Sequence, residues 1–265
     1  MTQVSARLAG VRLSKICLGT MRLDKAGDAA AAARILDHAL ELGITSFHCS
    51  SEYETFPLFQ QAWRRRRNQG RTEVIAKVAV PHFGESRFSS SLFREKIDFY
   101  LDALSIERLD VVQWLLRYDL KQEDARRHIL AESAEEISAL AADLRKSGKI
   151  GALVSFPYTV GVAQDVLPMD FCDGLAVYVN PLEREMDSML DAAHSLGKAA
   201  IAIRPYAAGR VFTEAKLEPT DALDHVFGFP AVVSAVVSAS SAEHLDVLGR
   251  YASSAPVDGG SDVPL

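Results

Sequence analysis

Three residues of this chain carry side chains suited to proton transfer: His48, Tyr53 and Lys77. His48 and Tyr53 lie five positions apart in the stretch GITSFHCSSEYE, residues 43–54, and Lys77 lies inside the apolar run EVIAKVAV, residues 73–80. A tyrosine protonates a carbonyl oxygen near neutral pH only when its pKa falls below the usual value of about 10. Because a nearby ammonium group stabilises the phenolate, Lys77 could lower the pKa of Tyr53 if the fold brings the two side chains together.

The predicted elements around His48 and Tyr53 place them at the end of a strand. Asp28 can cap a helix over residues 29–42, and Gly43 suits the position that follows a helix C-terminus. Residues 44–49 then form a short buried strand, and the polar residues 50–53 follow it directly. In a β/α barrel the chemistry is placed at this C-terminal edge of the strands.

The rest of the chain alternates between apolar runs and helical patterns. Residues 11–22 predict a strand or a hairpin. The apolar runs that follow are residues 44–49, 73–80, 109–116, 150–156, 174–180, 199–205 and 231–240. Such runs, separated by amphipathic helices, are typical of parallel strands covered by helices. Six or seven such units favour a (β/α)8 TIM barrel over an open doubly wound sheet, which more often carries a G-x-G-x-x-G turn that is missing here.

The C-terminal part of the pattern is less regular. No eighth strand is recognisable there, so an incomplete or atypical C-terminal unit is an alternative to a complete barrel. We predict a single barrel domain over residues 1–251, followed by a polar tail over residues 252–265 that contains glycine and proline.

Composition and charge restrict the partners and the location. Apolar residues make up 48% and charged residues 24%, as in ordinary globular proteins. The formal net charge of −6 argues against a nucleic-acid surface, and no apolar run approaches the roughly 18–20 residues that span a membrane. MTQVSARLAG at the N-terminus lacks a signal-peptide pattern, and three scattered cysteines indicate reduced thiols, so we expect a cytoplasmic protein. The histidines show no ligand spacing, which predicts no metal site.

Several segments together resemble the aldo-keto reductase family. They extend over about Ser14 to Leu248, in an order and at spacings that are similar to those of the family. The segments are SKICLGTMR, AARILDHALELGITSFHCSSEY, VIAKV, ALSIERLDVVQWLLRYD, LRKSGKIGALVS, VYVNPLER, IRPYAAG and VVSAVVSASSAEHL. The resemblance implies a (β/α)8 TIM barrel of the aldo-keto reductase type.

The resemblance also implies NADPH-dependent carbonyl reduction by a tetrad of Asp, Tyr, Lys and His. Tyr53 matches the tyrosine, which is the proton donor, and Lys77 matches the lysine that assists it. The aspartate position falls on His48, and the histidine position falls on Leu115 or Leu116. His48 then either polarises a substrate oxygen in place of the lost histidine or is an interior histidine without a catalytic role.

A cofactor site at the strand ends is a further implication of the resemblance, with NADPH as the expected cofactor. The cofactor-binding positions are Gly19, Thr20, Ser155, Arg204 and Ser238. Some of the family's contact residues are replaced. Ala176 stands where the family has glutamine, and Ile203 stands where an aromatic residue stacks on the nicotinamide.

Substrate contacts are expected from residues at the ends of the predicted strands. The substrate-binding residues in this prediction are Arg117, Glu52 and Tyr118. Arg117 and Arg204 both follow predicted strands, where a guanidinium group can hold a phosphate or a carboxylate. Each could instead form a local ion pair, for example with Asp119 or Glu183.

The leading functional prediction is an aldo-keto reductase-like oxidoreductase that acts on a small carbonyl or sugar-derived substrate with NADPH. An alternative is a non-redox epimerase, isomerase or lyase that uses His48, Tyr53 and Lys77 on a sugar-like substrate. A non-catalytic member of the family is the third possibility. The expected partner is a small molecule, and no nucleic-acid or membrane partner is expected. The sequence is compatible with a homo-oligomer.

Overall fold

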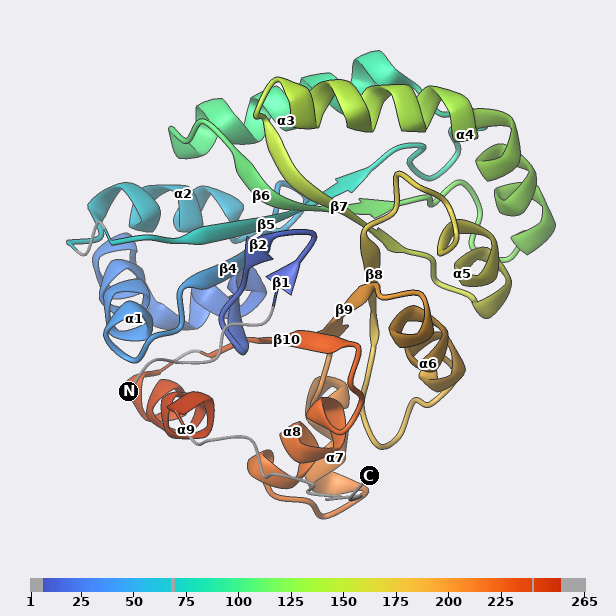
Figure 1. Cartoon of the computed structure of the whole chain (residues 1–265). Coiled ribbons are helices and arrows are strands. Elements are labelled where there is room, and N and C mark those ends of the chain that lie inside the picture. The colour runs from blue at the N-terminus through green and yellow to red at the C-terminus, as the bar shows by residue number, and fades with distance from the viewer. Residues whose placement is uncertain (1–6, 68–69, 240, 254–265) are drawn as a thin grey trace, which may run out of the picture.

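Eight parallel strands close into a barrel in the computed structural model, which describes residues 7–67, 70–239 and 241–253 (Figure 1). The strands are β3 (Ile16–Gly19), β4 (Ser46–Ser50), β5 (Glu73–Ala79), β6 (Leu109–Leu115), β7 (Ile150–Phe156), β8 (Gly174–Tyr178), β9 (Ala199–Ile203) and β10 (Val232–Val237). Around the barrel their order is β10-β3-β4-β5-β6-β7-β8-β9. This closed parallel sheet confirms the predicted (β/α)8 barrel.

Helices alternate with the strands and cover the outside of the barrel (Figure 1). They are α1 (Ala29–Glu41), α2 (Phe56–Arg65), α3 (Ser90–Leu104), α4 (Glu123–Lys146), α5 (Val160–Val166), α6 (Asp187–Ser195), α7 (Arg210–Thr213), α8 (Pro219–Phe227) and α9 (Ala242–Ser253), with short 3₁₀ segments η1 (Thr20–Ala26) and η2 (Ala207–Gly209). As predicted, Asp28 accepts a hydrogen bond from the backbone N–H of Ala31 (2.7 Å) and caps α1. Gly43 follows that helix with φ +79°, a conformation that favours glycine.

The strand that completes the barrel comes from the N-terminal part of the chain. Each of the seven predicted apolar runs overlaps with one strand, of which only β4 extends beyond its run, by one residue, and β3 within residues 11–22 is the eighth. Because β3 pairs with β10, the C-terminal unit is complete, and the alternative of an incomplete one is wrong. Helix α9 ends at Ser253, so the first two residues of the predicted tail are helical, and the remainder of the tail lies outside the described residues.

A hairpin of β1 (Arg7–Leu8) and β2 (Val11–Arg12) precedes the barrel and crosses its centre in Figure 1. Leu8, Val11 and Leu13 are buried and belong to the cluster that fills the barrel interior. In the same cluster lie Ala152 and Ala199, near the beginnings of their strands. The hairpin therefore closes the N-terminal end of the barrel and leaves the opposite end for a cavity.

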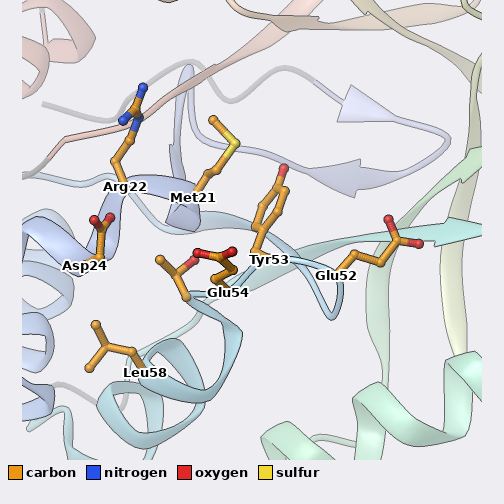
Figure 2. Close-up of a pocket in the computed structure, with 8 residues that line it drawn as sticks. Met21, Arg22, Asp24, Glu52, Tyr53, Glu54 and Leu58 are labelled. Carbon is orange, nitrogen blue, oxygen red and sulfur yellow. The ribbon is translucent and has the colours of Figure 1, made fainter.

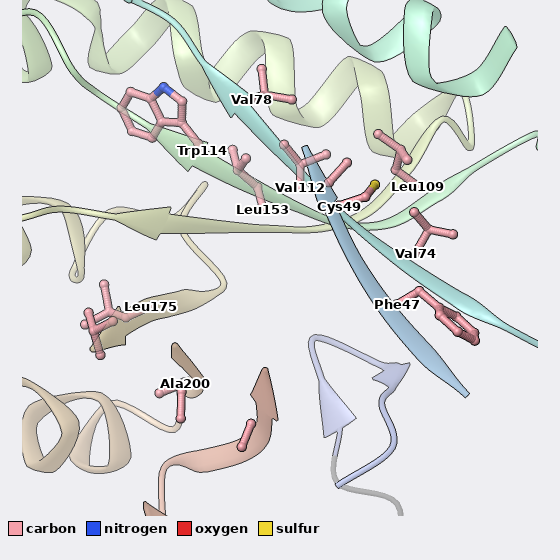
Figure 3. Packing of buried hydrophobic residues seen from close by; sticks show 14 of the residues in the cluster. Phe47, Cys49, Val74, Val78, Leu109, Val112, Trp114, Leu153, Leu175 and Ala200 are labelled. Carbon is pink, nitrogen blue, oxygen red and sulfur yellow. The ribbon is translucent and has the colours of Figure 1, made fainter. Parts of the chain in front are cut away.

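The side chains of each strand alternate between two cores. On β6, Val111 and Leu115 belong to the interior cluster, whereas Val112 and Trp114 belong to the larger cluster between strands and helices. Figure 3 shows part of this outer layer, with Phe47, Val112 and Trp114 among its labelled members. The alternation fixes which residues of a strand can reach the cavity. Within the described ranges, no helix combines the length and the apolar character needed to cross a membrane.

Candidate active site

A cavity of about 670 Å³ opens at the C-terminal ends of the barrel strands. Every strand contributes to its lining: in barrel order from β3 the residues are Gly19, His48, Lys77, Gln113, Phe156, Tyr178, Ile203 and Val236. Further lining residues come from the loops that follow the strands, and Tyr53 is one of them. The position agrees with the location of active sites in barrels of this kind.

Strand register explains why the cavity receives these side chains. Ser50 pairs with Lys77, and Lys77 pairs with Gln113 across the next strand. Residues at even spacing along a strand point to the same face, so His48 shares the inward face with Ser50. His48, Lys77 and Gln113 are therefore neighbours on three adjacent strands that line one wall.

His48 is buried and forms a hydrogen bond with Gln113. The distance from His48 Nε2 to Gln113 Oε1 is 2.8 Å, and because an amide oxygen only accepts, Nε2 carries the proton. Burial, together with the nearby positive charge of Lys77, lowers the pKa of His48 to about 3. His48 is therefore neutral near pH 7, and its Nδ1 has a lone pair rather than a proton. The prediction that His48 polarises a substrate oxygen does not fit this hydrogen bond, since that role needs a donor.

The buried His48 makes the stability of the fold depend on pH. Between its ordinary pKa of 6.5 and about 3, the unfolded chain binds a proton at this position and the folded chain does not. The free energy of unfolding should therefore fall by about 1.4 kcal/mol for each pH unit as the pH decreases through this window. We expect urea unfolding at pH 5 and pH 7 to show this loss in the wild type and a smaller one in His48→Asn. Equal pH dependence in the two proteins would contradict the assignment.

Lys77 and Tyr53 lie together at the cavity, as their sequence positions predict. Lys77 Nζ is 4.9 Å from the centre of the Tyr53 ring. Burial and the positive charge of Arg117 lower the pKa of Lys77 to about 8, and burial raises the pKa of Tyr53. Among the described residues, no carboxylate lies within the 4.0 Å of Lys77 Nζ that defines an ion pair.

Arg117 connects the loops that follow β4, β5, β6 and β7. Its Nη1 donates to Glu52 (2.6 Å) and to Nε2 of His82 (2.9 Å), and its Nε donates to the hydroxyl oxygen of Tyr158 (3.1 Å). The local acidic partner of Arg117 is thus Glu52 rather than Asp119. Arg117 also lines the cavity, so ion pairing and a role in ligand binding are compatible.

Two of the predicted substrate-binding residues do not line this cavity. Tyr118 packs against the outer core instead. Glu52 lines an adjoining cavity of about 610 Å³, which shares Met21, Arg22 and Tyr53 with the first one. Tyr53 therefore forms part of the wall between the two cavities. In the view of Figure 2 the carboxyl groups of Glu52 and Glu54 lie on opposite sides of Tyr53, so they do not form a carboxylate pair.

Three of the five predicted cofactor positions lie at the cavity. Gly19, Arg204 and Ser238 line it, on or after the adjacent strands β3, β9 and β10. Arg204 also forms an ion pair with Glu183 (3.7 Å), which is the local partner predicted as the alternative to a ligand phosphate or carboxylate. Two strands, β7 and β8, lie between this part of the lining and Arg117, since Arg204 follows β9 and Arg117 follows β6.

The other two predicted cofactor positions, Thr20 and Ser155, do not line the cavity. Thr20 is fully buried, and its hydroxyl donates to the backbone oxygen of His48 (3.2 Å). Ser155 lies on β7 next to the cavity-lining Phe156, so alternation turns its side chain away from the interior. Sequence order alone does not determine the face of a strand on which a residue lies.

Gln113 and Tyr158 are site residues that the sequence prediction missed. Gln113 is a polar residue in an otherwise apolar run, two positions before Leu115, and this spacing could have identified it. Of Leu115 and Leu116, only Leu115 lines the cavity, whereas Leu116 belongs to the outer core. Tyr158 lies after β7 and has a positive φ of 65°, and no pattern in the sequence indicates this backbone conformation.

Within the part of the chain that the structure describes, no group of three or more His, Cys, Asp or Glu side chains could hold a metal ion. Among the described residues the cavity lining contains aliphatic, aromatic, hydroxyl, amide, imidazole and cationic groups and no carboxylate.

The sequence itself identifies the family. Residues 15–225, which are most of the chain, match the aldo/keto reductase family. The chain belongs to the aldo/keto reductase family, and this membership supports an oxidoreductase. None of the curated proteins is significantly similar in sequence.

Solved structures with the same fold come from this family. The holo form of the aldo-keto reductase AKR11C1 from Bacillus halodurans has a TM-score of 0.78 and 18% identity, over 97% of this chain and 93% of that one. A putative aldo-keto reductase from Pseudomonas aeruginosa has a TM-score of 0.73 and 23% identity, over 94% of both chains. The glycerol dehydrogenase AKR11B4 from Gluconobacter oxydans has a TM-score of 0.70 and 18% identity, over 94% of this chain and 90% of that one. At these identities the similarity establishes the fold.

Proposed function

We propose that the protein is an oxidoreductase that interconverts a small carbonyl or sugar-derived compound and its alcohol with NADPH, with Tyr53 as the proton donor and Lys77 as its partner. The observation that carries the proposal is the contact between Lys77 and the Tyr53 ring at the mouth of the barrel. Family membership supports the redox class, and the cavity supplies room for a small substrate.

The lining on the β9, β10 and β3 side fits a nicotinamide nucleotide. Arg204 supplies a cation for a phosphate group, and Gly19 packs closely against Ser238, whose Oγ would lie 3.0 Å from a Cβ at position 19. The hydroxyl of Tyr206, which also lines the cavity, is buried without a hydrogen-bond partner among the described residues. Such an atom calls for a partner that the described residues do not supply, and a bound nucleotide is one group that can supply it. When bound, NADPH supplies the hydride.

Tyr53 and Lys77 would supply the proton and the charge stabilisation. As the substrate oxygen becomes negative, the Tyr53 hydroxyl gives it a proton and is left as a phenolate. Burial raises the pKa of Tyr53 and opposes this step. A unit charge about 5 Å away at an effective dielectric of about 20 contributes roughly 3 kcal/mol, or about two pKa units, in the favourable direction. Charged Lys77 therefore acts against the effect of burial, although the pKa of Tyr53 remains raised overall.

A second candidate is supported by the state of His48. Its neutral ring leaves Nδ1 as an acceptor beside Lys77, whose pKa is lowered to about 8. Such a pair could accept and return a proton on a sugar-like substrate without any cofactor, as an epimerase, isomerase or lyase does. The two candidates differ in their requirement for NADPH.

Nucleotide binding separates the two candidates. At about 100 times the dissociation constant, NADPH should add about 2.7 kcal/mol to the free energy of unfolding, which raises Tm by about 5 °C or more. The measurement is a thermal melt with NADPH and with NADH, in the wild type and in Arg204→Gln, where we expect a smaller shift. If neither nucleotide shifts Tm, the redox proposal is wrong and the non-redox candidate takes its place.

A further inference from the structure

Three hydrogen-bond donors lie side by side on one wall of the cavity. Lys77 is on β5, Arg117 follows β6 and Tyr158 follows β7, and these three strands are neighbours in the barrel. We call Lys77, Arg117 and Tyr158 the donor wall. It lies away from Gly19, Arg204 and Ser238, on the β9, β10 and β3 side.

Within the donor wall the Tyr158 hydroxyl oxygen accepts a hydrogen bond, whereas several N–H and O–H donors have no acceptor among the described residues. Arg117 Nε donates to the hydroxyl oxygen of Tyr158, so the proton of that hydroxyl is available to another acceptor. Arg117 Nη1 is used by Glu52 and His82, whereas Nη2 has no partner among the described residues. The Lys77 ammonium likewise has no hydrogen bond or ion pair within that part of the chain.

The charges at the donor wall do not balance. Lys77 and Arg117 are two cations with one carboxylate, Glu52, which is bound to Arg117. Their repulsion is part of the reason why the pKa of Lys77 is lowered. No Asp or Glu among the described residues lines the cavity itself. Because a buried charge needs a partner, a bound anion would complete this wall.

The backbone of Tyr158 is a second, independent sign of a ligand site. Its φ of 65° places a bulky residue in the left-handed region that favours glycine. Conformations of this kind persist where surrounding structure enforces them and are concentrated at ligand-binding positions. At this position the Tyr158 hydroxyl oxygen lies 3.1 Å from Arg117 Nε.

We propose that Arg117 and Tyr158 bind an oxyanion group of the substrate, a carboxylate or a phosphate, so that the carbonyl substrate of this protein is an anion. Arg117 Nη2 and the Tyr158 hydroxyl donate to the oxyanion, and Lys77 contributes charge from the adjacent strand. Glu52 competes for Arg117 and so limits the affinity in the free protein. This inference rests on the proposed function for the carbonyl part of the substrate, but the anion site can be measured without NADPH.

The test uses three probes of similar size: benzoate, phenyl phosphate and the neutral benzamide. We expect benzoate or phenyl phosphate to bind the wild type at least about tenfold more tightly than benzamide, because a charged group strengthens a hydrogen bond. Whichever anion binds more tightly identifies the substrate group as a carboxylate or a phosphate. Calorimetry in the absence of NADPH gives the dissociation constants.

Two variants at the donor wall should act in opposite directions. Arg117→Gln should weaken anion binding roughly tenfold to a hundredfold, since it removes a charged donor. Glu52→Gln should strengthen anion binding, because Arg117 then loses its competing carboxylate. Arg127→Gln is the matched control, since Arg127 pairs with Asp165 on the outside of the barrel. It should leave anion binding unchanged.

The outcomes distinguish the anion site from the redox proposal. Benzamide binding as tightly as both anions overturns the inference, and so does equal weakening of anion binding in Arg117→Gln and Glu52→Gln, which a structural role alone would produce. If Arg117→Gln does not fold, the tighter anion binding expected for Glu52→Gln still tests the inference. Anion binding without any NADPH binding would support the anion site and refute the redox proposal. NADPH-dependent reduction of a neutral aldehyde without anion binding would refute only the anion site.

Discussion

Replacement of Tyr53 by phenylalanine is expected to lower kcat/KM for carbonyl reduction by about 10²–10⁴-fold, the usual contribution of a positioned general acid. The substitution removes one hydroxyl group and keeps the ring that contacts Lys77. Binding of NADPH should stay close to that of the wild type, because the proposed nucleotide contacts lie across the cavity at Gly19, Arg204 and Ser238.

Tyr118→Phe provides the matched control for this substitution. Tyr118 also follows a strand, but its ring packs against the outer core and does not line the cavity. We expect steady-state kinetics of Tyr118→Phe to match the wild type. The assignment of the proton donor is wrong if Tyr53→Phe keeps full activity, or if both variants lose the same amount.

The second large effect concerns the charge of Lys77. Since burial and Arg117 lower its pKa to about 8, Lys77 is charged below that pH and becomes neutral above it. A neutral amine no longer stabilises the Tyr53 phenolate, so kcat/KM for reduction should decrease as pH rises through about 8. Lys77→Met should lose about a hundredfold in kcat/KM at pH 7, which corresponds to the roughly 3 kcal/mol of charge stabilisation.

A pH–rate profile between pH 6 and pH 10 tests this role. Lys77→Met should lack the alkaline decrease, and Arg117→Gln should move it to higher pH because a cation near Lys77 is removed. Lys149→Met, which breaks an ion pair with Asp98 away from the cavity, should keep the wild-type profile. A wild-type profile that is flat through pH 8, or full activity in Lys77→Met, argues against the proposed pair.

The barrel could be predicted because its signal is local and repeated. Apolar runs of five to seven residues in β4–β9 lie between amphipathic helices, and each predicted run overlaps with a strand of the structure. Strand β3 was harder to recognise, since it has four residues and is followed by the 3₁₀ segment η1 before α1 begins. Its pairing with β10 is a contact between distant parts of the sequence that no local pattern encodes.

In the candidate site, only residues that lie near or just after the ends of strands could be predicted from the sequence. Tyr53 follows β4 and Lys77 lies near the end of β5, and the barrel brings such positions together. The face of a strand decides the rest: Leu115 rather than Leu116 reaches the cavity, and Ser155 does not. The ion pair of Arg117 with Glu52 joins two loops that are 65 residues apart, so neither loop alone indicates it.

The most direct test of the central claim is the transfer of deuterium from NADPH labelled at C4 of the nicotinamide to an aldehyde, measured by mass spectrometry of the alcohol formed. With 4-carboxybenzaldehyde and the wild-type protein, the account predicts deuterium in the alcohol and at least about a hundredfold slower transfer in Tyr53→Phe. An alcohol without deuterium, no alcohol at all, or equal transfer by the two proteins would contradict it.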